Sequence, residues 1–266
     1  MTPALFVIAE SDFAQLTVGS TYTLAGDEGR HAVSVRRLNA GEKLWLTDGV
    51  GNVAVGAVLS TQGKDRLTVE VCSLVTEQPA SPSVTVVQAL IKGDRMDRAV
   101  EAMTEAGVDR IVVWVAAKSI ARWRVEQVNK AMTKLRRRIV EASKQSRRRH
   151  FPELSGPVDT AALAAGLGDG SLVPGSGQVL VLVLDEQAQE TIADVDFSLA
   201  NRIVLVVGPE GGVAATERAQ LAAAGARLVQ MGPTVMRAST AGTVALGAVM
   251  AAAGRWAPPD ISNVPD

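Results

Sequence analysis

The feature that most constrains the fold is an alternation of apolar runs with helical segments from residue 84 onward. The apolar runs are "VTVVQALI", "RIVVWVA", "VLVLVLDE", "NRIVLVVGPEGG" and "RLVQMGP". Continuous apolar runs of this kind are typical of strands buried on both faces. After the first run, Met96, Val100, Met103 and Ala106 share one helical face and Gly107 ends the helix. The alternation predicts an α/β fold, in which helices cover a parallel sheet on both sides.

The N-terminal part of the chain has a different pattern. Short runs rich in Val, Leu and Thr ("EKLWLTDG", "NVAVGAVLS", "RLTVEVCSL") are separated by Gly or Asp-Gly turns, which predicts a small antiparallel β-barrel. The stretch "TEQPASPS" contains two prolines among small polar residues and is typical of a linker. We therefore predict a barrel domain over residues 1–75, a linker over 76–83 and an α/β domain over 84–266.

Composition narrows the classes of function. The 266 residues contain one cysteine and two histidines, so a disulfide framework is excluded and a Cys/His zinc site is disfavoured. We see no acidic cluster with metal-ligand spacing and predict no metal. The N-terminus lacks a secretory pattern, and the Ala-rich stretch 241–253 is too short for a membrane span. The sequence therefore predicts a cytoplasmic protein without a membrane partner.

Two Gly-Pro loops follow apolar runs near the C-terminus. The first contains Gly208-Pro209-Glu210-Gly211-Gly212, and the second runs from Met231-Gly232-Pro233 to Arg237. Parallel sheets bind ligands at the carboxyl ends of their strands, and glycine permits close backbone approach. Neither loop matches a Walker A or GxGxxG pattern, so a flat uncharged heterocycle such as adenine is favoured over a polyphosphate. The alternative to ligand binding is a plain strand-to-helix turn for the first loop. For Met231 and Met236, the alternative is that their side chains pack in the hydrophobic core.

Arg237 stands where the second loop leads into a helix of small residues. A cation at a helix N-terminus opposes the helix dipole, which favours a functional role over a solvated surface charge. Ser239 lacks the nucleophile-elbow pattern, and two histidines offer little for a catalytic triad. A hydrolase is therefore disfavoured.

A long basic helix is predicted from about Val125 to Arg149. Its apolar stripe contains Val128, Met132, Leu135, Ile139 and Ala142. The clusters "KLRRR" and "KQSRRRH" are too dense for an ordinary solvated face and favour phosphate binding. His31, Arg36 and Arg37 in the N-terminal domain are further candidates for RNA backbone contacts, although a structural role is the stronger alternative for His31 alone.

Over nearly its whole length the chain resembles the bacterial 16S ribosomal RNA uracil-N3 methyltransferases of the SPOUT class. The resemblance rests on "GPEGG", on "MGPTVMRASTAG" where the family has Leu-Gly-x-x-Ile-Leu-Arg-x-Glu-Thr-Ala, on "TEAGV", and on "EASKQSRRRHFPEL". "RHAVSVRRLNAGEKLWLTDG" is similar to the family's small PUA-like RNA-binding barrel. The chain departs from the family in having Ser239 for Glu, Ala214 for Ser and Ala102 for Lys, and in lacking an Arg just before Phe6. The N-cap expected at position 214 is then missing or moved to Thr216.

The resemblance implies a SPOUT-type parallel sheet with a trefoil knot, S-adenosylmethionine bound between the two Gly-Pro loops, and a homodimer. The expected donor contacts are Leu184, Val207, Gly208, Pro209, Gly211, Gly212, Met231, Gly232, Pro233, Val235, Met236 and Thr240. The expected contacts to 16S rRNA of the small ribosomal subunit are His31, Arg36, Arg37, Arg137, Arg138, Gln145, Ser146, Arg147 and Arg148.

The chemistry assigns expected roles to two residues. Methyl transfer from a sulfonium is an in-line displacement in which the protein supplies positioning and charge. Uracil N3 must lose its proton, so we expect Arg237 to stabilise the uracil anion. Glu210 is expected to act as base or orient a donor group, or else to pin its own loop. The alternatives are a SPOUT methyltransferase acting on a tRNA ribose 2′-oxygen, and a non-catalytic RNA-binding protein.

Overall fold

The computed structural model describes residues 3–257, and these divide into two compact units. The first unit comprises residues 3–79 together with 143–151, and the second comprises 80–142 together with 152–257. The segment 143–151 thus makes its contacts with the N-terminal unit although it follows the first helices of the α/β unit in the chain.

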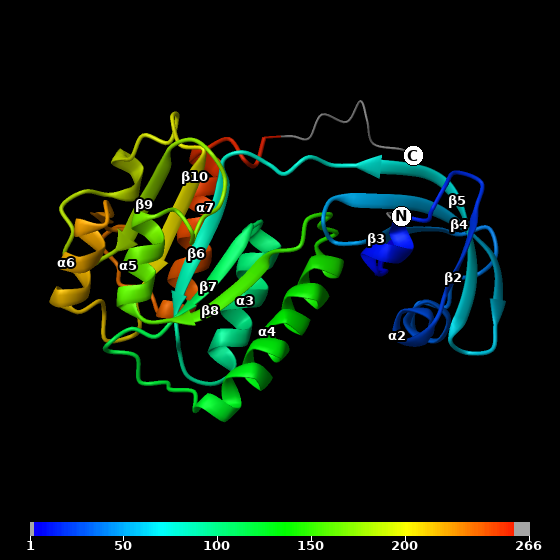
Figure 1. Ribbon diagram of the computed structural model, residues 1–266, viewed down its shortest axis with the longest axis horizontal. Coiled ribbons are helices and arrows are strands. Elements are labelled where there is room, and N and C mark those ends of the chain that lie inside the picture. Colours follow the sequence, from blue (N-terminus) through cyan, green and yellow to red (C-terminus); the bar gives the residue numbers. More distant parts are fainter. Residues whose placement is uncertain (1–2, 258–266) are drawn as a thin grey trace. The chain divides into compact units, whose positions relative to one another are not determined.

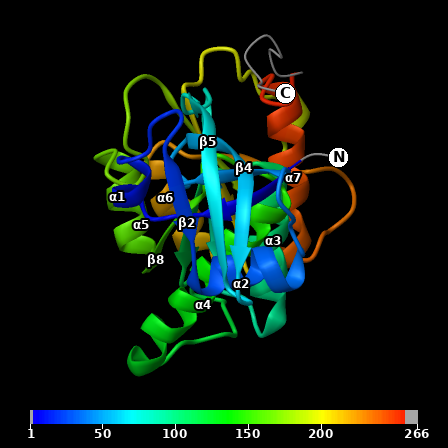
Figure 2. The ribbon, with the colours of Figure 1, turned by 90° about the vertical axis from the view of Figure 1, so that its right-hand side faces the viewer.

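The first unit is built on a five-stranded sheet. Its strands are β1 (Ala4–Val7), β2 (Thr21–Leu24), β3 (Lys43–Thr47), β4 (Asn52–Gln62) and β5 (Arg66–Thr76), in the order β1-β3-β4-β5-β2. Figure 2 shows β5 between β4 and β2. The pairs are antiparallel as predicted, except that β1 and β3 are parallel. The short β1 and β2 were not predicted, because four-residue runs carry little periodicity.

The core of this unit is formed by apolar side chains that are buried at alternate positions along the strands. Leu67, Val69 and Val71 of β5 are buried at every second position, as a half-buried strand requires. They pack with Phe6 and other apolar residues of the sheet. Helix α1 (Glu10–Phe13) and helix α2 (Gly26–Arg30), which continues into the π-helical turn η1 (His31–Val35), complete the unit. Gly29 is required in α2 because a Cβ there would lie 2.1 Å from the backbone oxygen of Asp65.

The second unit contains the predicted parallel sheet. Its six strands are β6 (Ser83–Ala89), β7 (Arg110–Trp114), β8 (Glu153–Val158), β9 (Val179–Leu184), β10 (Arg202–Val207) and β11 (Arg227–Val229), in the order β11-β9-β10-β6-β7-β8. All neighbouring pairs in this sheet are parallel. The α/β class is therefore confirmed. Strand β8 was not predicted, since "ELSGPV" lacks an apolar run.

Helices cover both faces of this sheet (Figure 1). Helices α3 (Asp94–Ala106), α4 (Val125–Gln145) and α7 (Ala238–Ala252) bury apolar residues against one face. Helices α5 (Thr160–Gly168) and α6 (Ala215–Ala223) cover the other, and the short 3-10 helix η2 (Ile192–Asp194) joins the first core. Within β10, Leu205 packs on the face covered by α3, α4 and α7, and Val206 packs on the face covered by α5 and α6. This is expected for a strand buried on both sides.

Helix ends follow local chemistry, with two differences from the prediction. Helix α3 ends at Gly107 in the left-handed conformation, as predicted. Helix α4 ends at Gln145 rather than near Arg149, because Arg147 adopts a φ of 56° that does not continue a right-handed helix. Ala214 occupies the N-cap position of α6 and makes no side-chain cap hydrogen bond, so the side-chain cap is missing, as the first of the two predicted alternatives has it, and has not moved to Thr216. Helix α5 runs through Gly168 and so takes the first residues of the loop predicted over 166–178.

Within residues 3–257, no helix is long and apolar enough to cross a membrane. Among the same residues, no three His, Cys, Asp or Glu side chains are grouped so that they would hold a metal ion.

Candidate active site

The two Gly-Pro loops line one cavity of about 580 Å³ in the second unit. The cavity lies at the carboxyl ends of β9, β10 and β11, which are neighbours in the sheet. We call it the donor cavity, after the methyl donor that the sequence resemblance predicts for these loops. Its lining includes Leu184, Val207, Gly208, Pro209, Glu210, Gly211, Gly212, Met231, Gly232, Pro233, Val235, Met236 and Arg237. Thr240, which was also predicted, does not line the donor cavity; it lies in the first turn of α7.

The first Gly-Pro loop is a tight turn. The amide of Gly212 donates to the carbonyl oxygen of Pro209 at 2.9 Å, and Gly212 has a φ of +69°. A Cβ at Gly208 would lie 2.8 Å from a methyl group of Val213. The glycines therefore allow the backbone to turn back on itself at the cavity wall, where side chains would otherwise intrude.

Glu210 is paired with a residue that sequence reasoning missed. Its Oε1 lies 3.5 Å from Nη1 of Arg95 at the start of α3, and both side chains are partly exposed. The pair connects positions 115 residues apart in the chain, so no local pattern indicated it. An exposed pair of this length is weak, which leaves the carboxylate of Glu210 accessible.

Arg237 occupies the N-cap position of α7 and is exposed. Its carbonyl oxygen accepts hydrogen bonds from the amides of Thr240 and Ala241, at 2.8 and 2.9 Å. The backbone of Arg237 is thus fixed by the helix, while the guanidinium remains available to a ligand in the donor cavity.

The donor cavity also has a charged wall that was not predicted. Asp185 follows β9 directly, and its carboxylate is 5% exposed. This carboxylate pairs with Arg218 Nη1 at 2.8 Å and accepts from the amide of Gln187 at 2.8 Å. All three residues line the donor cavity, as does Lys118. The one available signal was the polar stretch "DEQ" directly after an apolar run.

Comparison with known proteins identifies the family. A model of the RNA methyltransferase domain matches residues 77–250, and a model of the RNA methyltransferase PUA domain matches residues 24–72. The chain belongs to the RNA methyltransferase family. Ribosomal RNA small subunit methyltransferase E of Mycobacterium bovis is 42% identical over 238 residues, which cover 90% of this chain and 89% of that protein. The protein of the same name in Bacillus subtilis is 24% identical over 242 residues, covering 88% and 91%.

A solved structure shows the same fold. The crystal structure of ribosomal RNA small subunit methyltransferase E from Neisseria gonorrhoeae, bound to S-adenosyl methionine, superposes with a TM-score of 0.79. It is 24% identical and covers 94% of this chain and 98% of that one. The predicted fold, a SPOUT-type parallel sheet with an N-terminal PUA-like domain, is therefore confirmed.

In the first unit of this methyltransferase, the predicted RNA contacts fall into two groups. Arg36, Arg37 and Arg147 are exposed, and Arg37 and Arg147 both have a φ of 56°. His31 is half-buried, with its ring edge-on to Phe6 at 5.9 Å. Burial lowers the pKa of His31, and so does the charge of Lys144, while Glu28 acts in the opposite direction. The lowered pKa favours the neutral imidazole, which offers hydrogen bonds rather than charge.

The remaining predicted contacts lie on α4 and directly after it. Arg137 and Arg138 both pair with Glu141, at 3.2 and 3.4 Å, which reduces the net positive charge of this helix face. Gln145 and Ser146 are exposed. The Nε of Arg148 donates to a backbone oxygen at 3.0 Å. The exposed Arg36, Arg37 and Arg147 of the first unit therefore remain the strongest candidates for phosphate contacts.

Proposed function

We propose that this RNA methyltransferase transfers a methyl group from S-adenosylmethionine to N3 of a uridine in 16S rRNA of the small ribosomal subunit. The observation that supports this most strongly is the donor cavity, in which two glycine-rich loops and Arg237 converge. The relatives named above are small-subunit rRNA methyltransferases, and one was solved with this methyl donor.

The residues of the donor cavity fit this donor. Gly208 and Gly212 leave backbone at the wall where a Cβ would crowd or strain the loop. Leu184, Val207 and Met231 offer apolar contacts for a flat heterocycle. The buried carboxylate of Asp185, already paired with Arg218, adds a fixed polar group that can accept hydrogen bonds from the donor. S-Adenosylmethionine, once bound there, supplies a methyl group already activated on a sulfonium.

The chain itself has to bind the acceptor and handle its proton. Arg237 stabilises negative charge on a uracil oxygen as N3 loses its proton, through a charge-assisted hydrogen bond. Glu210 is accessible because its pair with Arg95 is long and partly exposed, and it accepts the N3 proton or directs a donor group. Each role requires only a group that already lines the donor cavity.

The first unit and α4 hold the surrounding RNA in this proposal. Arg36, Arg37 and Arg147 contact phosphates, while His31, Arg137, Arg138, Gln145, Ser146 and Arg148 add weaker or neutral contacts. The target uridine has to be unstacked, because base pairing hides N3. The proposal also includes the trefoil knot, the homodimer and a cytoplasmic location, which follow from the family resemblance.

The deciding experiment measures methyl transfer from labelled S-adenosylmethionine to small subunits that lack the modification. Free 16S rRNA and tRNA serve as competing substrates, and the digested nucleosides are identified by mass spectrometry. We expect 3-methyluridine from small-subunit RNA. A 2′-O-methylated tRNA nucleoside would overturn the substrate and the acceptor atom. Absence of both transfer and donor binding would leave a non-catalytic RNA-binding protein.

A further inference from the structure

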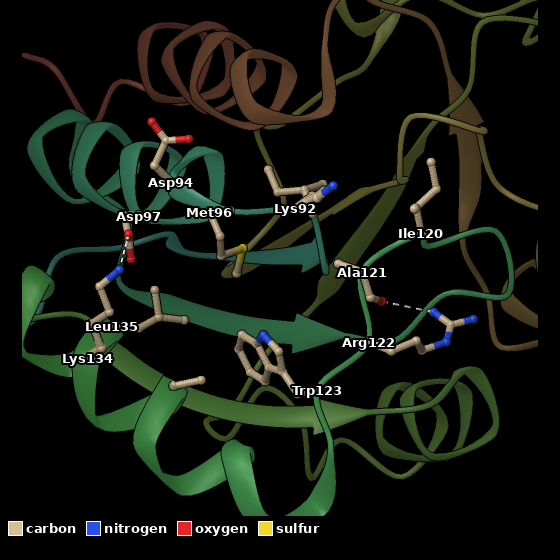
Figure 3. Close-up of a pocket in the computed structure, with 13 residues that line it drawn as sticks. Lys92, Asp94, Met96, Asp97, Ile120, Ala121, Arg122, Trp123, Lys134 and Leu135 are labelled. Atoms are coloured by element: carbon tan, nitrogen blue, oxygen red, sulfur yellow. Dashed lines mark hydrogen bonds and ion pairs between the residues drawn. The ribbon is translucent and has the colours of Figure 1, made fainter.

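Figure 3 shows the residues that line a second cavity, of about 590 Å³. It lies at the same edge of the parallel sheet as the donor cavity. It is formed after the ends of β6 and β7, and β6 is the direct neighbour of β10 in the sheet. Its walls come from the start of α3, from the loop between β7 and α4, and from α4 itself. We call it the α3–α4 cavity.

The α3–α4 cavity combines an apolar floor with a polar rim. Met96 and Leu135 are buried, and Trp123 is half-buried and packs against the same core. Figure 3 shows the side chains of Met96, Leu135 and Trp123 projecting into the cavity from three different segments. Lys92 and Asp94 are exposed at its edge. An indole plane beside apolar groups, with charges at the rim, suits a flat ring that carries polar atoms and a phosphate.

The loop that carries Trp123 is held in place by its own hydrogen bonds. The guanidinium of Arg122 donates to the carbonyl oxygens of Ala116 and Ala117, at 3.3 and 3.2 Å. Arg122 therefore shapes the loop rather than serving as an anion ligand. On this loop Ile120 is 77% exposed. A fixed loop that presents an exposed isoleucine beside a half-buried tryptophan is prepared for a partner that covers both.

The α3–α4 cavity and the donor cavity share structural elements. Lys118, from the loop that carries Trp123, lines the donor cavity. A Cβ at Gly211 of the first Gly-Pro loop would lie 3.2 Å from the Cβ of Lys118. Arg95, which follows rim residue Asp94, pairs with Glu210 of the donor cavity. A nucleotide in the α3–α4 cavity would therefore adjoin the place where the methyl group is supplied.

We propose that the α3–α4 cavity binds one unstacked nucleobase of the substrate RNA, with Trp123 stacking on its face and Lys92 contacting its phosphate. This inference rests on the proposed function, because it takes the occupant to be RNA delivered to the donor cavity. Methylation at N3 requires a base to leave the stack, and a displaced base needs an aromatic or apolar surface to replace its stacking partners. The base is either the acceptor uridine or its neighbour in the RNA.

The test uses Trp123→Ala and Trp123→Phe in the full chain. Stacking on one aromatic side chain is worth a factor of about 5 to 100 in affinity, so Trp123→Ala should weaken binding of small subunits by that factor. Trp123→Phe should retain most of the affinity, since a smaller ring still stacks. Binding is measured by sedimentation with S-adenosylhomocysteine present, and the KM for subunits is measured beside it. The affinity for S-adenosylmethionine, measured by calorimetry, should be unchanged in both variants.

Val125→Ala is the matched control, because Val125 is 89% exposed in the adjacent segment and does not line the α3–α4 cavity. It should bind subunits as the wild type does. A fall in kcat as well as in subunit affinity for Trp123→Ala would assign the acceptor uridine to the cavity, and a change in affinity and KM alone would assign the neighbouring base.

If Trp123→Ala binds small ribosomal subunits as tightly as the wild type does, and the wild type transfers methyl groups normally, this inference is overturned and the proposed function stands. If Trp123→Ala has a changed molar mass in light scattering and an unchanged affinity for small ribosomal subunits, the inference is also overturned. The loop would then be assigned to a protein–protein contact. Failure of the wild type to methylate any RNA would instead overturn the proposed function.

Discussion

The buried carboxylate of Glu217 accepts a hydrogen bond from the backbone amide of Ala117 at 2.8 Å, across 100 residues of sequence. The same oxygen accepts from the hydroxyl of Thr160 at 2.6 Å, and Oε2 accepts from the amide of Ala214 at 3.1 Å. Glu217 is 4% exposed. One side chain therefore joins the end of the first Gly-Pro loop to the loop that carries Lys118 and Trp123.

Glu217→Gln should destabilise the protein by about 1–3 kcal/mol, because the amide nitrogen of Gln cannot accept the hydrogen bonds that one carboxylate oxygen accepts. It should also weaken binding of S-adenosylmethionine, since the wall of the donor cavity loses its support. Urea denaturation and calorimetry measure the two effects. Glu105→Gln is the control, as Glu105 is exposed on α3. Equal stability of the two variants would contradict the role given to Glu217.

Arg237→Ala should lower kcat by about 10²–10³-fold, the usual cost of removing a group that stabilises developing negative charge. Donor affinity should change little, because the loop backbone that binds the donor remains. Single-turnover methyl transfer and calorimetry separate these effects. Arg98→Ala, on the exposed surface of α3, should behave as the wild type. Equal losses in turnover and in donor binding would sink the catalytic assignment of Arg237.

Gly212→Ala should cost roughly 1–2 kcal/mol, because its φ of +69° is unfavourable for any residue with a Cβ. The space around Gly212 is open, so the cost arises from backbone strain and not from a clash. Gly168→Ala is the control, since it lies in α5, also with open space around it. Chemical denaturation compares the two. A Gly212→Ala variant as stable as Gly168→Ala would show that the loop tolerates another conformation.

The stability of the protein should fall on mild acidification in a manner that depends on His31. Burial lowers the pKa of His31 from its ordinary value of 6.5, so the unfolded chain takes up this proton first as the pH falls. The contribution of His31 to stability is therefore complete above about pH 6.5 and decreases below it. His31→Gln should have a flatter profile between pH 7.5 and 5.5 in urea denaturation. Parallel profiles for the two proteins would rule out this linkage.

Much of the architecture follows from the sequence alone, because its causes are local. Apolar runs such as Ile203–Val207 predict strands buried on both faces, and the helical spacing of Met96, Val100 and Met103 predicts the buried face of α3. Gly107 ends that helix as predicted, since glycine readily adopts the left-handed conformation. The Gly-Pro turns after two such strands predicted a cavity at the carboxyl edge of the sheet, and both loops line one cavity there.

Other features were decided only by tertiary structure. The pairing of Arg95 with Glu210, the charged wall formed by Asp185 and Arg218, and the contact between Glu217 and Ala117 join residues far apart in the chain. No periodicity encodes such pairs, because they depend on which loops the folded sheet brings to the same edge. The predicted end of α4 was also wrong. Arg147, with its positive φ, lies in the segment 143–151, which belongs to the first unit. The sequence alone determined the apolar strands of the parallel sheet, the helix α3 and the sheet edge at which both Gly-Pro loops lie, because their causes are local. Long-range packing decided which charges face the donor cavity and that a second cavity lies at the same edge.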